Sequence, residues 1–534
     1  MASRSSSVSR TQSDYGHRST SIALGESTFE RAGADDWEAA AEGALRGAPL
    51  SSLRRTLLGG IETAPLYSPH RHSTDGDPAG LPGASPFARG AAATSGSGGW
   101  EVRQAHDVTL PGTPDAIAID TTSGVDAVTV ARGWNAESDR AALSAGIGDA
   151  TRAGVTIHLQ SGTSPAHAAA LADVLERHSV DAERVRSWLG LDPIAAAASG
   201  WSRTEARDST ELVSAMCAAA RSGAEIAQRS PLAVPLEADG SVFADAGASD
   251  ATELAAMLAT GVVWLRAICD SPDGPGLTPS EGARLLGFTL SAGPDPFGVT
   301  AKCRALRMCW TRILSTCGVD GTAGEGLPMR LHAVTSTAML SALDPWVNML
   351  RATTATFGAA NGGVDAITVR PFDAVTAGPA SSGLGWRVAA NTQLILRHES
   401  RIGSVIDPAG GSWYLEDLTR KTAHAAWERF RQIEAAGGIC TAMSSGEIEA
   451  SIAAERARRH EHIDAGDQVL VGVTKFLSPE AEPSDMAAAR TSEEQSRGGG
   501  EPRNQVTGGA AGRLDGGLGI HRWAAPYERG TAAS

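Results

Sequence analysis

Two arginines and one histidine in short apolar runs have side chains that could bind or orient a ligand. Arg330 and His332 lie in "MRLHAVTS" (residues 329–336), and Arg370 lies in "AITVRPF" (residues 366–372). A buried guanidinium needs an anionic partner or exposure to solvent, so a salt bridge or a ligand phosphate would satisfy either arginine. His332 either contacts a ligand or is a hydrogen-bonded core residue. We take Arg330 and His332 as the candidate substrate-binding residues.

Two other motifs have the composition of binding sites but lack the rest of a signature. The turn Asp407-Pro408-Ala409-Gly410-Gly411-Ser412 could hold a phosphate with its N–H groups, but it has neither a Gly-Lys-Ser/Thr ending nor a G-x-G-x-x-G pattern. We expect a structural turn. His70 and His72 lie in a segment rich in Pro and Gly that offers no third ligand, so no metal site is predicted. Catalytic Ser/His/Asp groups or carboxylate pairs have no local signature, although groups paired only in space leave none.

Charge and cysteine content exclude several classes of protein. The 46 Lys and Arg against 61 Asp and Glu give a net charge of −15, without a basic cluster, which argues against nucleic acid or an anionic membrane as the partner. No run of 18 apolar residues indicates a membrane span, and the Ser- and Arg-rich N-terminus lacks the apolar core of a secretory signal. We expect a cytoplasmic protein. Its cysteines are predicted to be reduced core thiols; they are Cys217, Cys269, Cys303, Cys309, Cys317 and Cys440.

Composition divides the chain into four parts. Residues 1–26 are predicted to be a disordered tail, residues 27–104 a helical and then extended segment, residues 105–476 a barrel, and residues 477–534 a linker-like tail. Within the barrel, apolar runs alternate with longer helical patterns, which is typical of a parallel sheet with crossover helices. We count eight such runs, which predict a (β/α)8 TIM barrel in the α/β class. They are residues 127–133, 155–160, 187–194, 232–238, 262–268, 286–292, 329–336 and 366–372.

Helix starts and stops agree with this count. Asp295-Pro296 and Asp344-Pro345 each place a carboxylate at the N-cap and proline at the first helical position, and Asn361-Gly362-Gly363 supplies a left-handed stop. After Asp295, one stripe of the helix is predicted to pack on the barrel, with Lys302, Arg304 and Arg312 off that stripe. The stripe consists of Val299, Cys303, Leu306, Trp310, Ile313 and Cys317.

Three segments resemble the barrel of the methylmalonyl-CoA mutase family. They are "KCRALRMCW" (302–310), "DPWVNMLRATTATFGAANGG" (344–363) and "NTQLILRHESRIGSVIDPAGGSWYLEDLT" (391–419), and the resemblance extends from about residue 37 to residue 476. Residues 60–67 and 80–90 are similar to the lead-in segment that, in this family, wraps the partner subunit. The resemblance implies a radical 1,2-rearrangement between methylmalonyl-CoA and succinyl-CoA, with adenosylcobalamin as cofactor and the acyl-CoA bound along the barrel axis.

The sequence departs from the catalytic pattern of the family. Where catalytic members carry a Gly-Tyr-His whose histidine bonds the thioester carbonyl, this chain has Gly240-Ser241-Val242, and the valine cannot donate that bond. No tyrosine lies between residues 68 and 413, so the tyrosine beside the adenosyl group is missing. The family pattern Arg-x-His-x-Gln-x-x-Gly-Trp becomes Arg330, His332, Val334, Thr337 and Ala338. No counterpart of the cobalamin-binding motif Asp-x-His-x-x-Gly is expected.

These departures favour the small subunit of the heterodimeric mutase. The resemblance then implies no catalytic residue in this chain, adenosylcobalamin on a catalytic large subunit, and mutase activity only in the complex. Two alternatives remain, namely a mutase barrel that uses a separate cobalamin-binding chain and a stand-alone acyl-CoA-binding or scaffold protein. An acyl-CoA phosphate would suit Arg330 or Arg370. The sequence leaves open whether small residues such as Ala127, Ala131, Ala233 and Ala292 leave a channel or bulky neighbours fill it.

Overall fold

The structure is a computed structural model, and it describes most of the chain. The described residues are 33–68, 79–92, 99–110, 112–131, 135–137, 139–178, 187–200, 208–319, 327, 329–377, 383–478 and 518–528. The chain divides into two compact units, Met1–Arg55 and Thr56–Ser534. The first contains helix α1 (Ala34–Ala44) and the 3-10 helix η1 (Leu50–Leu53). The amide of Gly33 donates to the Asp36 carboxylate at 2.6 Å, which closes the first turn of α1.

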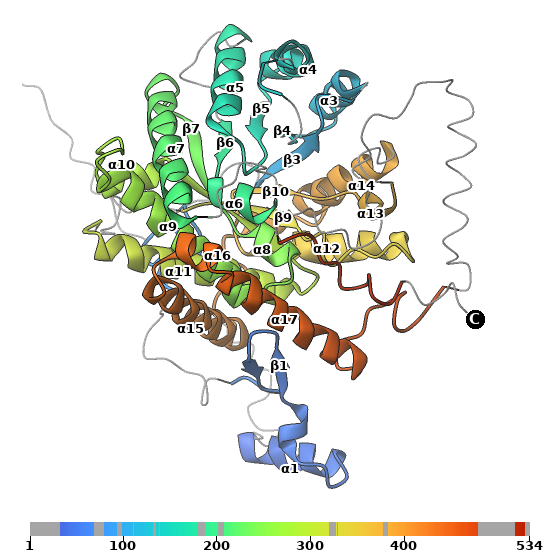
Figure 1. Ribbon diagram of the computed structural model, residues 1–534. Helices are drawn as coiled ribbons and strands as arrows, with labels where there is room; N and C mark the ends of the chain where they lie inside the picture. The colour runs from blue at the N-terminus through green and yellow to red at the C-terminus, as the bar shows by residue number, and fades with distance from the viewer. Residues whose placement is uncertain are drawn as a thin grey trace, which may run out of the picture. The chain divides into compact units, whose positions relative to one another are not determined.

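The second unit is built on eight parallel strands that form a barrel (Figure 1). Neighbouring strands follow the order β5-β4-β3-β10-β9-β8-β7-β6. The two ends of this order meet where Thr163, just after β5, donates its amide to the carbonyl of Gly190 in β6 at 2.9 Å. The strands are β3 (Glu101–His106), β4 (Ala127–Val130), β5 (Thr156–Leu159), β6 (Ser187–Leu191), β7 (Ala233–Asp239), β8 (Leu286–Ala292), β9 (Arg330–Thr335) and β10 (Ala366–Thr368).

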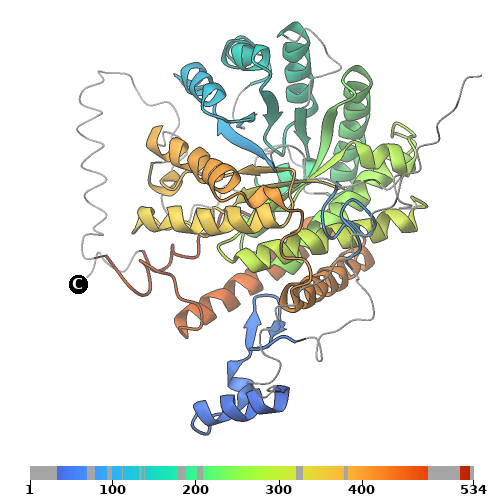
Figure 2. The ribbon, with the colours of Figure 1, turned by 180° about the vertical axis from the view of Figure 1, so that it is seen from behind.

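Helices surround the strands on the outside, as the two opposite views show (Figures 1 and 2). The long helices are α3 (Thr113–Thr122), α4 (Arg140–Arg152), α5 (Pro165–His178), α7 (Ser209–Arg229), α9 (Asp250–Cys269), α11 (Pro296–Thr316), α12 (Pro345–Asn361), α14 (Gly383–Leu394), α15 (Trp413–Ala435) and α17 (Glu447–Asp464). The short ones are α6 (Pro193–Ala198), α8 (Ser241–Asp245), α10 (Pro279–Arg284), α13 (Ala374–Ala377), η4 (Ile395–Glu399), η5 (Ile402–Ser404) and α16 (Ile439–Ser444). Before the barrel, β1 (Arg55–Leu57) pairs with β2 (Ile61–Thr63).

The predicted (β/α)8 class is confirmed, but one predicted strand is wrong and one was missed. Residues 262–268 are the last turns of α9, not a strand. Because α9 is buried on almost every side, its apolar residues show no helical period, and a short apolar run of this kind cannot be distinguished from a strand. The strand that the prediction missed is β3, which is the first barrel strand in the sequence. Its residues, "EVRQAH", are too polar to be recognised as a strand.

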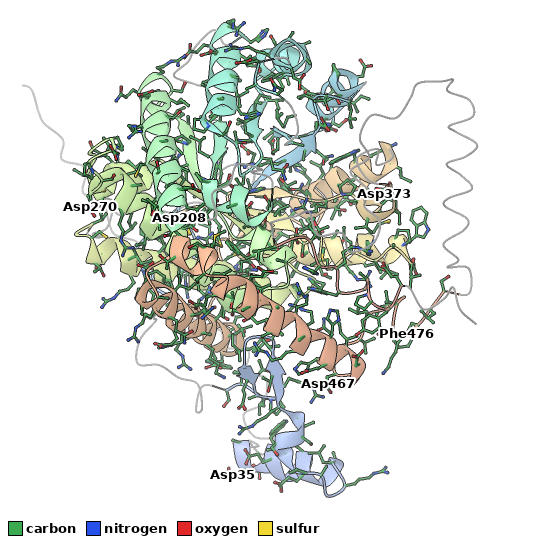
Figure 3. The ribbon with its side chains drawn as sticks, in the orientation of Figure 1. Asp35, Asp208, Asp270, Asp373, Asp467 and Phe476 are labelled. Carbon is green, nitrogen blue, oxygen red and sulfur yellow. The ribbon has the colours of Figure 1, made fainter. Side chains whose placement is uncertain are left out.

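The predicted helix boundaries agree with the structure. The carboxylate of Asp295 accepts from the amide of Phe297 at 3.1 Å and caps α11. Helix α12 begins at Pro345 as predicted, although Asp344 makes no side-chain cap bond, and it ends before Gly363, which has a φ of 66°. Asp208, which is labelled in Figure 3, lies just before α7 and caps it in the same way as Asp295, since its carboxylate accepts from the amide of Thr210. These local signals therefore locate the crossover helices.

The predicted packing stripe of α11 is buried except for Cys317 at its end. However, Lys302 and Arg304, which were predicted to lie off the stripe, are also buried. All six cysteines are free, and four of them are buried. After α17, a turn is closed by a single bridge between Val471 and Lys475.

Among the described residues, α9 is the one helix long and apolar enough to cross a membrane. Its most apolar window is 83% buried inside the protein, which is the property of a core helix. Trp264 in α9 donates its indole N–H to the carbonyl of Glu237 in β7 at 2.8 Å. This bond fixes α9 against the outside of the barrel.

Candidate functional site: the barrel interior

The side chain of Trp188 crosses the interior of the barrel. It projects from β6, yet its ring lies 4.6 Å from the guanidinium carbon of Arg103 in β3 and 6.2 Å from the ring of His332 in β9. Neither β3 nor β9 is a neighbour of β6 in the sheet. A side chain that touches both strands must therefore span the lumen.

Trp188 fits into the barrel interior because residue 287 in β8 is a glycine. A Cβ atom at residue 287 would come within 2.6 Å of the indole ring, far inside van der Waals contact. The indole therefore lies directly over the backbone of β8, where only a glycine leaves room. Arg103 is 4% exposed and Trp188 is 8% exposed, so the guanidinium and the indole fill this level of the barrel together.

Arg103 belongs to a charged group at the same level. Its Nε donates to Glu101 at 2.6 Å, and the Nε2 of His158 lies 2.9 Å from the same carboxylate oxygen. The Nδ1 of His158 accepts from the amide of Trp188 at 2.7 Å. Burial alone would raise the pKa of Glu101, but Arg103 and His158 outweigh it and hold this pKa well below its ordinary value.

The histidine of this group is neutral. Burial, followed by the nearby charge of Arg103, lowers the pKa of His158 to about 4. A neutral imidazole that accepts at Nδ1 must carry its proton on Nε2, so His158 donates to Glu101. The ion pair of Glu101 and Arg103 is therefore anchored to β5 and, through the Trp188 amide, to β6.

Of the two predicted substrate-binding residues, the structure places His332 inside the lumen. Its Nδ1 lies 3.0 Å from the hydroxyl of Thr289 and its Nε2 lies 2.9 Å from the hydroxyl of Thr368. Burial, followed by the charge of Arg103, lowers its pKa well below the ordinary value. Both ring nitrogens have protein partners, as expected for a hydrogen-bonded core residue. Arg330 is the first residue of β9 and lies at the amino end of the strand.

The other arginine considered from the sequence, Arg370, lies at the opposite end of the barrel. Its Nε donates to the carbonyl of Thr335 at 3.0 Å, and its guanidinium lies 3.5 Å from the carboxylate of Asp245. Of the two ways to satisfy this guanidinium, the structure therefore shows the salt bridge. The barrel does not bring Arg330 and Arg370 to one site.

Two further carboxyl groups, Asp192 and Glu237, which sequence reasoning missed, lie buried near Arg103. Burial raises the pKa of Asp192 to about 7, although this carboxylate accepts from the amides of Ala195 and Asp239. Burial, followed by the charge of Asp239, raises the pKa of Glu237 to about 8, and the hydroxyl of Thr289 donates to it. The signal in the sequence is polar residues two apart in an apolar strand, as in Glu237 and Asp239, which marks a polar inner face.

Val242 lies in α8, in the loop that follows β7 at the carboxyl end of the barrel. Its side chain is partly buried and packs against the main apolar core. An apolar side chain with this packing offers neither a donor nor an acceptor to a ligand.

The glycine-rich turn is held by side chains rather than built around a phosphate. Arg304 donates to the carboxylates of Asp407 and Glu416, and the amide of Gly411 donates to Glu416 at 3.0 Å. A Cβ at residue 410 would approach the Asp407 carboxylate to 2.5 Å, so a larger residue there would displace the carboxylate that Arg304 holds. This agrees with the predicted structural turn.

The described part of the chain contains no cluster of three or more His, Cys, Asp or Glu residues that could hold a metal ion. His70 and His72 lie outside the described residues. At the level of Trp188 and Arg103, the barrel interior is thus a packed layer of ion pairs, hydrogen bonds and ring contacts.

Comparison with known proteins gives the family. The family model for methylmalonyl-CoA mutase matches residues 149–498. The methylmalonyl-CoA mutase small subunit of Streptomyces virginiae is 36% identical over 504 residues, which cover 90% of this chain and 78% of that protein. The small subunit from Propionibacterium freudenreichii subsp. shermanii is 32% identical, over 86% of this chain and 72% of that protein. The probable small subunit of Mycobacterium tuberculosis (strain ATCC 25618 / H37Rv) is 35% identical, over 74% of this chain and 62% of that protein. The chain belongs to the methylmalonyl-CoA mutase family.

Proposed function

We propose that this chain is the noncatalytic small subunit of an adenosylcobalamin-dependent methylmalonyl-CoA mutase. Its partner is a catalytic large subunit that carries out the isomerisation of methylmalonyl-CoA to succinyl-CoA, and the complex is cytoplasmic. Relatives whose names include "small subunit" support the assignment to a two-subunit enzyme.

The observation that carries the proposal is the filled lumen. A mutase barrel that binds acyl-CoA along its axis needs an open path through that axis. Here Arg103 and Trp188 occupy it, and Gly287 leaves room for the indole beside β8. His332 is saturated by Thr289 and Thr368, so it has no remaining ring nitrogen for a thioester carbonyl.

These residues do not fit the cofactor or the substrate of the family. Adenosylcobalamin chemistry requires an open axis for the acyl group and a donor toward the thioester, whereas residue 242 is a valine. The large subunit is therefore the proposed site of both adenosylcobalamin and acyl-CoA, and this chain contributes a folded barrel that supports its partner.

The test is reconstitution with purified proteins. This chain alone, with methylmalonyl-CoA and adenosylcobalamin, should form no succinyl-CoA, and activity should appear when the large subunit is added. Size-exclusion chromatography should show the two chains eluting together. Turnover by the isolated chain would refute the proposal.

A titration of the isolated chain with coenzyme A and methylmalonyl-CoA distinguishes the alternatives. A mutase barrel that uses a separate cobalamin chain and a stand-alone acyl-CoA-binding protein both require binding, and the filled lumen predicts none. Saturable binding in the micromolar range would therefore favour one of those two functions.

A further inference from the structure

The described segment near the end of the sequence, Leu518–Glu528, lies along the carboxyl end of the barrel. Its backbone amides bond to three loops in turn. Leu518 donates to Ala198 at 2.7 Å, His521 donates to Asp245 at 2.7 Å, and Trp523 donates to Ala338 at 2.8 Å. These carbonyls belong to the loops that follow β6, β7 and β9. The segment therefore binds the end of the barrel from which active sites of this fold are built.

Charged side chains fasten the last turn of the segment. Glu528 accepts from the amide of Ala342 at 2.7 Å and forms a two-pronged ion pair with Arg522, with distances of 2.8 and 2.7 Å. The hydroxyl of Tyr527 donates to Asp464, at the end of α17, at 2.7 Å. The bidentate pair lies within the segment and fixes the geometry of its last turn, and the bonds of Glu528 to Ala342 and of Tyr527 to Asp464 hold that turn on the barrel.

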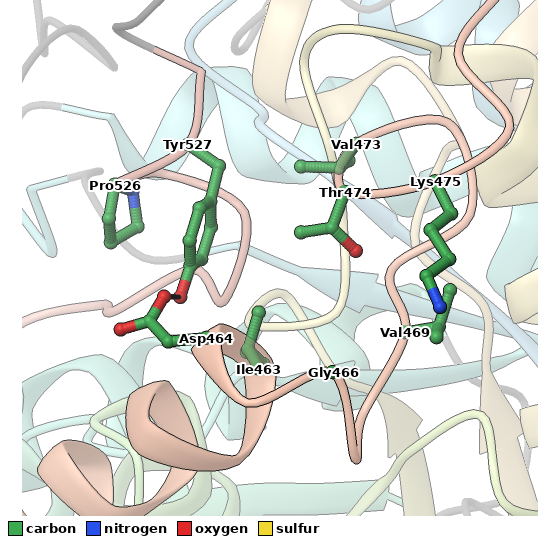
Figure 4. Close-up of a pocket in the computed structure, with 9 residues that line it drawn as sticks. All are labelled: Ile463, Asp464, Gly466, Val469, Val473, Thr474, Lys475, Pro526 and Tyr527. Atoms are coloured by element: carbon green, nitrogen blue, oxygen red, sulfur yellow. Dashed lines mark hydrogen bonds between the residues drawn. The ribbon is translucent and has the colours of Figure 1, made fainter.

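The apolar contacts of this seat come mostly from partly buried side chains. Ala524 is the one buried residue of the segment, and it packs with Ile463, Leu470 and Val473 in a cluster separate from the main core. Leu518 and Trp523 are partly buried and pack against the edge of the main core. The guanidinium of Arg459 lies 4.2 Å from the ring of Trp523. Beside the cluster, Pro526, Tyr527 and residues 469–475 line an open pocket of about 580 Å³ (Figure 4). Because one side chain of the segment is buried and the rest lie at the surface of the barrel beside an open pocket, the segment can leave without opening the strands.

Asp245 couples this seat to the rest of the rim. Its carbonyl receives the segment, while its carboxylate accepts from the hydroxyl of Ser336 at 3.0 Å and from the amide of Thr337 at 2.9 Å. The same carboxylate pairs with Arg370. Asp245 ends α8, the helix that carries Val242. A hydrogen bond that restrains the Asp245 backbone therefore also restrains the loops after β7 and β9.

We propose that Leu518–Glu528 is a releasable strap, and that the rim formed by the loops after β6, β7 and β9 is a docking surface for this segment of the same chain. When the strap is bound, α8 and residues 336–343 are clamped together at the carboxyl end of the barrel. When it leaves, these loops loosen while the strands remain intact. This inference does not depend on the absence of catalysis.

Hydrogen exchange of the full-length chain tests the strap. The double variant Trp523→Ala/Glu528→Ala removes the ring and the carboxylate that seat it, and Ile520→Ala changes a side chain that is 62% exposed and serves as the matched control. We expect amides in residues 243–248 and 336–343 to exchange about tenfold faster in the double variant. Amides of β8 and β9 should be unchanged, and the control should match the wild type.

A synthetic peptide of residues 518–528, added to the double variant, should restore slow exchange in the same loops. Unchanged exchange in the double variant would overturn the clamp. Faster exchange in β8 and β9 as well would show that the segment is part of the cooperative core and not a releasable strap. Failure of the peptide to restore protection would overturn the docking surface.

Discussion

The contact between Gly287 and Trp188 allows a sharp test of the filled lumen. In the wild-type chain, Gly287→Ala places a methyl group within 2.6 Å of the indole carbons. Such overpacking in a rigid core costs about 1–3 kcal/mol. Trp188→Ala removes the ring that fills the axis and the partner of the Arg103 guanidinium, and a buried Trp→Ala change costs about 3–5 kcal/mol.

The two changes should not add. Once the indole is gone, a methyl group at residue 287 enters empty space, and alanine is better than glycine in a strand interior by about 0.5–1 kcal/mol. Gly287→Ala should therefore change from destabilising to neutral or stabilising in the Trp188→Ala background. The resulting coupling free energy is on the order of 2 kcal/mol.

Urea unfolding of the wild type, both single variants and the double variant measures this coupling. Gly293→Ala is the matched control, because a Cβ at residue 293 meets no heavy atom within 4 Å, and it should be nearly neutral in both backgrounds. Additive effects of Gly287→Ala and Trp188→Ala, within the error of the unfolding free energies, would refute the placement of the indole across β8 and with it the main support for the proposed function.

Two further predictions concern buried charges. The pKa of Glu237 is about 8 in the fold, above the ordinary value of about 4.3, so its contribution to stability is present at low pH and is lost as the pH rises through 8. Glu237→Gln should weaken the loss of stability between pH 5.5 and pH 8.5, with Asp192 keeping part of it; an unchanged pH slope would contradict this. Lys302 donates to Asp250 at 2.9 Å and to Glu253, so Lys302→Met should destabilise the chain by about 3–5 kcal/mol. Adding Glu253→Gln should recover part of that loss in thermal unfolding, and no recovery would contradict the pairing.

The fold was largely predictable because each strand–helix repeat of the barrel has its own apolar run and helix-start residues in the sequence. Seven of the eight predicted runs contain strands, namely all except residues 262–268. The two errors have one physical cause, since burial was inferred from apolar composition alone. Helix α9 is apolar because helices α11 and α15 cover it as well as the barrel, whereas β3 is polar because Glu101 and Arg103 face the lumen.

The interior was not predictable because it depends on partners that are distant in the sequence. Lys302 and Arg304 lie off the apolar stripe of α11, as predicted, yet they are buried because α9 supplies Asp250 and Glu253 and the glycine-rich turn supplies Asp407. The predicted run 187–194 contains Trp188, but the sequence did not show to which face of β6 its side chain points. The register of β6 shifts between Trp188 and Leu191, and Gly190 in this shift has a φ of 63°, so simple alternation does not determine which residues of β6 face the axis.

The alternation of strand side chains explains how a mutase-type barrel can lose its channel and keep its shape. Residues that face the helices, such as Leu236 and Leu331, form the main core, whereas Trp188 and Glu237 face the lumen. Because successive side chains of a strand point to opposite faces, the lumen can be filled without changing the packing of the outer helices. A partner that recognises the outside of the barrel would therefore meet the same helices whether the axis is open or closed. Under the proposed function, this independence of the two faces lets the barrel support a partner while Arg103 and Trp188 occupy its axis.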